Sequence, residues 1–136
     1  MRRLVGFIVI AVCLLMPAPA GSAEAEGGPV VTGPAAKYYG YATAVVVAQP
    51  GSAVNYHNFD IEKHNVVQDP IADGVTNKKK QRWCADFPKG RCPLFWSKLI
   101  GMGETPIKGL ENIKPGNVYT FYCTLHPGMR GRLLAI

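Results

Sequence analysis

Short alternations of apolar and polar side chains, and not helical repeats, dominate the pattern along the chain. Residues 54–59 (VNYHNF) alternate as a strand with one buried face does. Residues 118–123 (VYTFYC) form a second such passage after the turn signal KPGN at 114–117, and residues 132–136 (RLLAI) suit a short closing strand. Outside the first 23 residues, no apolar pattern keeps helical spacing over three turns. Short strands between Pro/Gly turns predict an all-β sandwich or barrel.

Residues 1–23 have the organisation of a secretory signal peptide. Two arginines precede an apolar run that ends at Pro17 after 13 residues, and small residues follow. A membrane-spanning helix needs about 20 apolar residues, so this run is short for a retained anchor, which is the alternative. We therefore predict cleavage after Ala20 or Ala23, and a mature chain that is periplasmic or otherwise extracytoplasmic, with no membrane span.

The rest of the chain has the length of one domain. Residues 24–36 (EAEGGPVVTGPAA) are rich in Gly, Pro and Ala, which predicts a flexible lead segment. We place the domain at 37–136, where residues 38–48 open it with β-branched and aromatic side chains. Residues 68–110 differ from the rest in composition, because basic side chains are concentrated there.

Charge adds one local feature to this picture. The chain has 15 Lys/Arg against 9 Asp/Glu, and without residues 1–23 the counts are 13 and 9. The resulting net charge, near +4, is too mild to indicate nucleic-acid binding. Seven of the basic residues lie between Lys78 and Lys98, against one acid, Asp86. This stretch is either a solvated surface loop or a docking surface for an acidic partner. Its two tryptophans, Trp83 and Trp96, are interpreted as packing groups, and we expect a monomer.

The cysteines divide into a pair and a single thiol. Cys13 lies in the predicted signal peptide, so the mature chain keeps Cys84, Cys92 and Cys123. In an exported protein Cys84 and Cys92, eight residues apart, predict a local disulfide. A second metal site is the alternative for this pair, although no histidine accompanies it. The odd cysteine, Cys123, needs another reason, such as a metal or a reactive thiol.

A second motif supplies that reason. Cys123, His126 and Met129 bring a thiolate, an imidazole and a thioether into seven residues, a ligand set suited to copper and not to calcium or magnesium. Two imidazoles and a thiolate with a weak axial methionine form the blue-copper site, so a second histidine is required. His64, which begins a predicted strand, is the candidate. His57 lies on an alternating strand and is expected to face solvent.

Three other interpretations compete for this motif. A buried thiol beside a hydrogen-bonded histidine needs no metal. Zinc also binds Cys and His, but it prefers a fourth Cys, His or carboxylate over a thioether. A catalytic Cys–His pair is also conceivable; however, no Asp or Asn lies near His126 in sequence to orient its ring. A binuclear copper centre would need two cysteines in the loop, and there is one.

These residues resemble the cupredoxins, the small blue copper proteins that include plastocyanin, amicyanin and pseudoazurin. The matching positions are Val54-Asn55-Tyr56-x-Asn58-x-Asp60-x-x-x-His64-Asn65-Val66 and Pro115-Gly116-x-x-Tyr119-x-Phe121-Tyr122-Cys123-x-x-His126-x-x-Met129-x-Gly131. The two-residue gap between His126 and Met129 is similar to that of amicyanin. The resemblance covers roughly residues 40–67 and 110–136. It leaves the basic middle without a counterpart, so it implies a basic, disulfide-closed insertion at about residues 68–110.

The resemblance implies a Greek-key β-sandwich that holds one type 1 copper ion at one end through His64, Cys123, His126 and Met129. It implies an electron carrier that cycles between Cu(I) and Cu(II), not an enzyme, with His126 as the exit for the electron. Asn65 is expected to brace the ligand loop. Redox proteins would dock near His126 or on the Lys78–Lys98 stretch. The alternative function is copper binding or delivery without electron transfer.

Overall fold

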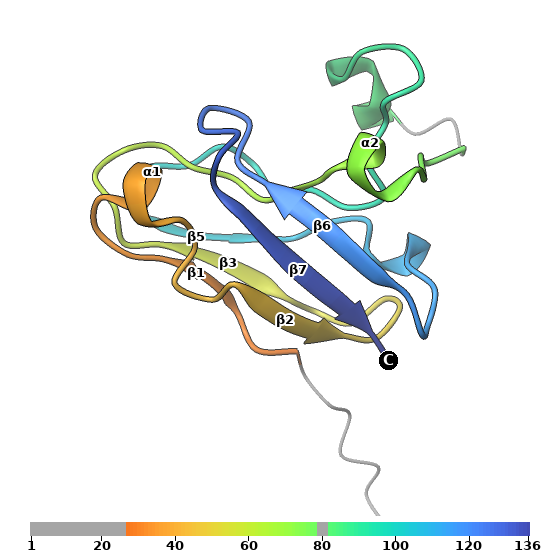
Figure 1. Ribbon diagram of the computed structural model, residues 1–136, viewed down its shortest axis with the longest axis horizontal. Coiled ribbons are helices and arrows are strands. Elements are labelled where there is room, and N and C mark those ends of the chain that lie inside the picture. The colour runs from red at the N-terminus through yellow and green to blue at the C-terminus, as the bar shows by residue number, and fades with distance from the viewer. Residues whose placement is uncertain (1–26, 79–81) are drawn as a thin grey trace, which may run out of the picture.

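The computed structural model describes residues 27–78 and 82–136, which form two β-sheets packed face to face (Figure 1). The predicted β-sandwich is therefore confirmed. The predicted signal peptide, residues 1–23, lies outside the described residues. No helix in the described part of the chain is long and apolar enough to cross a membrane.

The smaller sheet has three strands in the order β1-β3-β5. β1 (Val30–Thr32) runs parallel to β3 (Asn55–Asn58), and β3 pairs in antiparallel fashion with β5 (Gly103–Pro106). The alternation predicted for 54–59 is seen here, because Tyr56 and Asn58 are buried while Asn55 is exposed. His57 therefore lies on the outer face, with 29% of its side chain exposed.

The larger sheet has four strands in the order β2-β7-β6-β4. β2 (Val45–Ala48) runs parallel to β7 (Arg130–Ala135), and β6 (Val118–Tyr122) lies between β7 and β4 (Val67–Gln68), antiparallel to both. Side chains alternate along β2, β6 and β7, so one face of the sheet is buried against the smaller sheet. The strands contribute these buried apolar side chains to the core: Val30, Val46, Ala48, Tyr56, Tyr119, Phe121, Leu133 and Ala135.

The helical segments are single turns at the ends of strands. α1 (Ala36–Tyr39) follows β1, and α2 (Pro70–Asp73) follows β4, where the Asp69 side chain accepts hydrogen bonds from the first N–H groups of the helix. Two short 3-10 helices, η1 (Arg82–Asp86) and η2 (Leu110–Asn112), lie in the connections. Residues 38–48 thus begin with helical residues rather than with a strand.

The lead segment is shorter than predicted. Within residues 24–36, Val30 and Thr32 are completely buried and belong to β1, which pairs with β3. Two valines and a threonine, each branched at Cβ, favour extended backbone, and the neighbouring Gly and Pro residues obscured this signal. The prediction that the lead is flexible up to residue 36 is therefore wrong for this strand.

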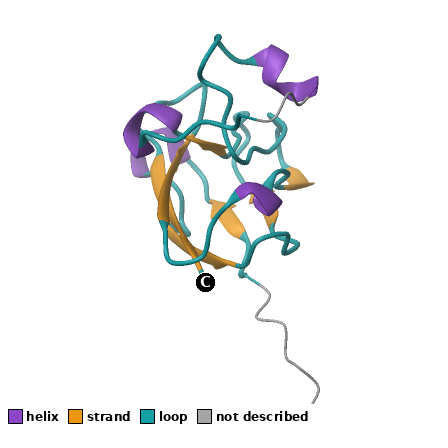
Figure 2. Ribbon diagram, turned by 90° about the vertical axis from the view of Figure 1, so that its right-hand side faces the viewer, coloured by secondary structure: helices purple, strands orange, loops and turns teal. Residues whose placement is uncertain are grey.

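The insertion is also shorter than residues 68–110. Leu94 and Phe95 are buried in the core, and the backbone of Trp96 bonds to that of Lys108 in both directions. Together with β5, this part belongs to the sandwich. The remainder, with α2 and η1, extends beyond the upper edge of the sheets (Figures 1 and 2). There the predicted disulfide between Cys84 and Cys92 is confirmed.

Candidate metal centre

A tight loop between β6 and β7 carries three of the predicted ligands. The backbone N–H of Cys123 donates to the carbonyl of Met129 (3.2 Å), and the N–H of Met129 donates to the carbonyl of His126 (2.8 Å). The N–H of His126 in turn donates to the carbonyl of Cys123 (3.2 Å). These bonds close the loop on itself, so the C-x2-H-x2-M spacing brings three donor side chains to one end of the sandwich.

His64 comes from a different part of the chain, the connection between β3 and β4. Its backbone pairs with Ile100 through two hydrogen bonds of 3.0 Å. The buried Asn58 side chain fixes the same connection, since its amide donates to the carbonyls of Glu62 (2.8 Å) and Ile100 (3.0 Å). The backbone around His64 is therefore set by packing against the smaller sheet.

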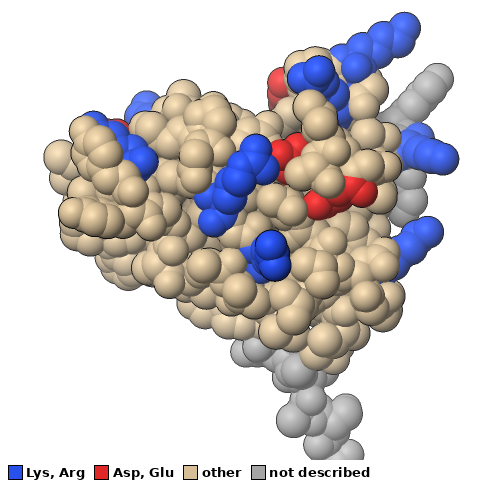
Figure 3. All heavy atoms as spheres, in the orientation of Figure 1, with Lys and Arg blue, Asp and Glu red and all other residues tan. Residues whose placement is uncertain are grey.

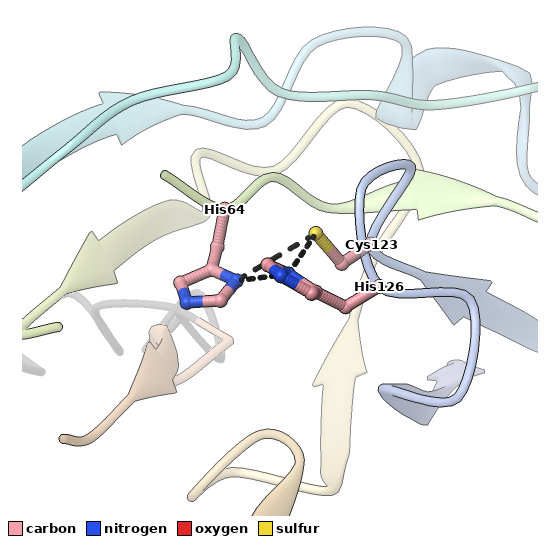
Figure 4. Close-up of side chains that lie close together, drawn as sticks. All are labelled: His64, Cys123 and His126. Atoms are coloured by element: carbon pink, nitrogen blue, oxygen red, sulfur yellow. Dashed lines mark hydrogen bonds between the residues drawn. The ribbon is translucent and has the colours of Figure 1, made fainter. Parts of the chain in front are cut away.

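The side chains of His64, Cys123 and His126 point toward one another (Figure 4). Cys123 Sγ lies 3.7 Å from His64 Nδ1 and 3.8 Å from His126 Nδ1, and the two Nδ1 atoms lie 3.1 Å apart. The point equidistant from these three atoms is about 2.1 Å from each, which is the length of metal–nitrogen and metal–sulfur bonds, roughly 2.0–2.3 Å. The donor triangle has the size that one metal ion requires.

The donor chemistry fits copper. Two imidazoles and a thiolate in a trigonal set match the equatorial ligands of a type 1 copper ion. Met129, in the same loop, is 1% exposed and offers a thioether as a weak fourth donor. Zinc would be better served by a carboxylate, imidazole or second thiolate at that position. Among residues 27–78 and 82–136, His64, Cys123 and His126 form the one cluster of potential metal ligands.

The site is buried on one side and open on the other. His64 and Cys123 are completely buried, whereas 23% of the His126 side chain is exposed. Leu125, Pro127 and Gly128 around His126 are exposed. His126 is thus the route by which the buried cluster reaches the surface.

Asn65 connects the His64 segment to the ligand loop. Its side-chain Oδ1 accepts hydrogen bonds from the backbone N–H of Thr124 (2.9 Å) and from the Thr124 hydroxyl (3.1 Å). Its backbone carbonyl accepts a hydrogen bond from the Tyr41 hydroxyl (2.5 Å), and the Tyr41 ring packs edge-on against Phe121. Burial, and to a smaller extent the nearby Cys123, raise the pKa of Tyr41 far above its usual value, so Tyr41 stays a hydrogen-bond donor.

Two carboxylates, Asp60 and Glu62, approach the outer nitrogens of the site histidines. Asp60 Oδ2 lies 3.2 Å from His64 Nε2, and Glu62 Oε2 lies 3.4 Å from His126 Nε2. Burial alone would raise the pKa of Asp60, but hydrogen bonds from the Ala36 N–H and the His64 ring outweigh it and lower the pKa to about 2. Neither carboxylate was predicted as a site residue. The available signal was their position, four and two residues before His64.

The other predicted residues lie outside this cluster. His57 Nδ1 is 3.7 Å from Glu104 Oε2 on the outer face of β3, and its ring stacks on Phe59 at a centroid distance of 6.3 Å. The Cys84–Cys92 disulfide lies in the segment beyond the upper edge, where Trp83 packs on Trp96 with ring centroids 5.9 Å apart. In the described part of the chain, no cluster of potential metal ligands includes Cys84 or Cys92, so the structure gives no support to a second metal site there.

Comparisons with known proteins agree with this geometry. The family model of copper binding proteins of the plastocyanin/azurin family matches residues 30–135. A search of curated sequences found no relative. Among solved structures, the fold is similar to a purple cupredoxin from Nitrosopumilus maritimus (16% identity, TM-score 0.52), with 80% of this chain and 99% of that one covered.

Amicyanin variants are similar in the same way. The Cu(I) form of a methionine-to-alanine variant matches with 18% identity and a TM-score of 0.50, with 79% of this chain and 80% of that one covered. The Cu(I) form of a methionine-to-glutamine variant matches with 19% identity and a TM-score of 0.51, with 84% and 87% covered. With the donor triangle, the thioether and the family match together, copper is the cofactor, and this chain belongs to the plastocyanin/azurin family of copper-binding proteins, the cupredoxins.

Proposed function

We propose that this protein is an exported carrier of single electrons, in which His64, Cys123 and His126 are the equatorial ligands of one type 1 copper ion and Met129 is the axial ligand. The observation that carries the proposal is the convergence of two Nδ1 atoms and one thiolate sulfur from two chain segments that are each fixed by backbone hydrogen bonds. When bound, copper supplies the Cu(I)/Cu(II) couple.

The chain's own contribution is to hold the donor atoms still. His64 and Cys123 are completely buried, and their backbones are bonded to Ile100 and Met129, respectively. A donor set that keeps one geometry requires little rearrangement when the charge at its centre changes by one. This property suits electron transfer, and no open position for a substrate is needed. We accordingly place the protein among electron carriers and not among enzymes.

The partly exposed ring of His126 is the proposed point of electron exit. Leu125, next to it, is 54% exposed, so an apolar surface borders the ring on the ligand loop. A partner that covers this surface would come within contact distance of an imidazole whose other nitrogen faces the thiolate. His64 cannot serve this purpose, because it is completely buried.

The basic stretch, residues 78–98, is the proposed docking surface for an acidic redox partner. Lys89 and Arg91 are exposed on the loop that the Cys84–Cys92 disulfide closes, and Arg82 is exposed just before it. Figure 3 shows Lys and Arg side chains at the upper right, where this segment extends beyond the sheets. Complementary charge accelerates encounter more than it strengthens binding. Reversal of Lys89 and Arg91 to Glu should therefore slow association with an acidic one-electron protein, most clearly at low ionic strength.

Exposed charges are screened over about 10 Å at 0.1 M salt, so the difference between variant and wild type should shrink as salt is added. For the single reversal Lys89→Glu the matched control is Arg132→Glu, which changes the net charge by the same amount on the exposed side of β7. A reversal in the loop that slows the reaction no more than Arg132→Glu, at every salt concentration, would leave the loop as an ordinary solvated surface.

Copper storage or delivery is the competing function, and a redox experiment separates the two. A carrier keeps its copper through repeated reduction and oxidation, gives a reversible one-electron voltammogram, and exchanges electrons between its own Cu(I) and Cu(II) forms. A delivery protein releases Cu(I) to a chelator after reduction. Retention of copper in the presence of a Cu(I) chelator over several cycles supports the carrier, and stoichiometric loss after the first reduction contradicts it.

Export rests on the sequence of residues 1–23 alone. The proposal predicts that the secreted or periplasmic form begins at Gly21 or Glu24, after cleavage behind Ala20 or Ala23. N-terminal sequencing of protein recovered from that fraction tests it. A chain that keeps residues 1–23 and sediments with membranes would support the anchor instead.

A further inference from the structure

The connection between β3 and β4 places one carboxylate against each histidine of the copper site. Asp60 approaches His64 Nε2 at 3.2 Å, and Glu62 approaches His126 Nε2 at 3.4 Å. In both rings the other nitrogen, Nδ1, faces Cys123 Sγ. The two histidines come from different chain segments, yet each ring lies between a carboxylate and the thiolate. Both carboxylates lie in residues 60–62, so a single connection makes the same arrangement at both rings.

A carboxylate in this position controls which nitrogen of a neutral imidazole carries the proton. Such a ring carries a proton on one nitrogen and a lone pair on the other, and the partner of one nitrogen determines the state of the other. An ionised carboxylate can only accept a hydrogen bond, so it selects the form with the proton on Nε2. The lone pair then lies on Nδ1, the atom that faces the donor triangle. A carboxylate partner also makes the ring a more basic ligand.

Asp60 is built into the fold and is not a chance surface contact. Its residue is 4% exposed. Its carboxylate also accepts hydrogen bonds from the backbone N–H groups of Ala36 (2.8 Å), at the start of α1, and of Glu62 (3.4 Å). Its own N–H donates to the side chain of the buried Asn58 (2.9 Å). The carboxylate therefore has a fixed position before any metal binds, and it can orient the His64 ring.

Glu62 contacts the partly exposed ring of His126 and has a second partner, Lys37. Lys37 Nζ lies 2.5 Å from Oε1 of Glu62, while Oε2 faces His126. The Lys37 ammonium thus holds one oxygen and leaves the other for the imidazole. The Glu62 side chain is 37% exposed, so water competes for this contact and its effect should be smaller than that of Asp60.

We infer that Asp60 and Glu62 are positioning residues that fix the Nε2–H form and the orientation of His64 and His126. Asp60 contributes more because it is buried. The inference rests on the proposed ligand set, since it concerns the same two rings. Its first test needs no copper, so its failure can be told apart from the failure of the proposed function.

The first test measures the two forms of each ring by 15N NMR in copper-free protein, at about pH 8, where histidines are mostly neutral. In wild type, both His64 and His126 should carry the proton on Nε2. Asp60→Ala should shift His64, and Glu62→Ala should shift His126, toward a mixture of both forms, each by at least a few-fold in ratio. Asp60→Asn keeps an oxygen acceptor without the charge and should preserve the wild-type form of His64.

A matched control is available on the outer face of β3. Glu104 lies 3.7 Å from His57, which is not a ligand. Glu104→Gln removes one carboxylate beside a histidine without touching the site, and it should leave the spectra of His64 and His126 unchanged. If His64 and His126 remain fully in the Nε2–H form in Asp60→Ala and Glu62→Ala, as they do in Glu104→Gln, the inference is wrong. The same holds if wild type lacks that form.

The second test uses the copper-loaded protein and measures its reduction potential. Loss of a partner of a ligating histidine typically lowers metal affinity 10- to 100-fold. Asp60→Asn removes negative charge that favours Cu(II), and we expect about a tenfold selective loss of Cu(II) affinity, which raises the potential by about 59 mV. Glu62→Gln should raise it by less, and Glu104→Gln should not change it. Equal potentials in Asp60→Asn and Glu104→Gln would contradict the role of Asp60.

Discussion

The close contact between Gly131 and Phe121 allows a sharp test of how the fold supports the ligand loop. Gly131 on β7 lies opposite Phe121 on β6, and a Cβ atom at Gly131 would lie 2.3 Å and 2.5 Å from two carbons of the Phe121 ring. Phe121 is completely buried and packs edge-on against Tyr41 at a centroid distance of 5.0 Å. Because the ring is buried and packed on Tyr41, Gly131→Ala must displace either Phe121 and its neighbours or the strand that follows Met129.

Overpacking of this kind costs about 1–3 kcal/mol. For a domain of this size, each kcal/mol lowers Tm by roughly 4 °C or more. Thermal unfolding of the copper-free protein, followed by circular dichroism, measures the effect without contribution from the metal. The matched control is Gly128→Ala in the same loop, where no atom lies within 4 Å of the added Cβ and φ is not positive. The Tm of Gly128→Ala should equal that of wild type or exceed it slightly.

A second substitution tests the cause. Phe121→Leu shortens the side chain that the new methyl group meets, so it should cost less stability in the Gly131→Ala background than in wild type. The double-mutant cycle should thus show a coupling energy of about 0.5 kcal/mol or more. A Gly131→Ala variant that melts within 2 °C of Gly128→Ala, or a cycle that is strictly additive, would refute the reasoning.

Four further outcomes follow from the contacts described above. Asn65→Ala removes the acceptor for Thr124, and copper affinity should fall about 10- to 100-fold in a competition titration; an unchanged affinity would mean that the brace is dispensable. Met129→Leu should keep copper and raise the reduction potential, because a weak donor that favours Cu(II) is lost. Replacement of Cys84 and Cys92 by Ser should lower the free energy of unfolding, measured with denaturant, by about 2–3 kcal/mol and leave copper binding intact. Burial raises the pKa of Asp69, but the N–H groups of α2 and the Arg130 guanidinium outweigh it, so the net shift is downward. Its stabilisation is therefore present above about pH 4 and lost as pH falls further, and Asp69→Asn should flatten the stability profile in that acid range.

The ligand loop could be predicted because its information is local. Cys123, His126 and Met129 lie in one loop whose length alone brings their side chains together, and the alternation of apolar side chains in residues 118–123 fixes where the loop begins. The face of the strand at 54–59 could be assigned for the same reason. His64 was a candidate because it begins a predicted strand, and the resemblance identified it as a ligand, since nothing near it in the sequence indicates that it meets the loop.

Features that depend on distant contacts were not accessible. β1 is a strand because its three residues pair with β3, which begins 23 positions after β1 ends, and its own Gly/Pro-rich surroundings favour a loop. Phe95 and Trp96 belong to the sandwich because Gln68 and Lys108 form hydrogen bonds with their backbones, and Val67 lies opposite Trp96. The resemblance left these residues without a counterpart and so suggested an insertion, and the basic composition nearby does not indicate which backbone segments pair.

The carboxylates show the same limit. Asp60 lies four residues before His64, a spacing that on a helix would suggest a contact, but here the contact arises from a turn held by Asn58. Glu62 meets His126, 64 residues away in sequence, only because the ligand loop packs over this turn. Sequence patterns identified the donor atoms of the site, whereas the groups that orient those donors required the three-dimensional fold.

The visible absorption spectrum during titration with Cu(II) tests the central claim most directly. Copper held by the Cys123 thiolate in a trigonal site should give an intense thiolate-to-copper charge-transfer band that saturates at one copper per chain. Cys123→Ser should lose this band completely while the copper-free fold, judged by circular dichroism, remains. An absent band in wild type, or an equally intense band in Cys123→Ser, would contradict the assignment of this cluster as a type 1 copper site.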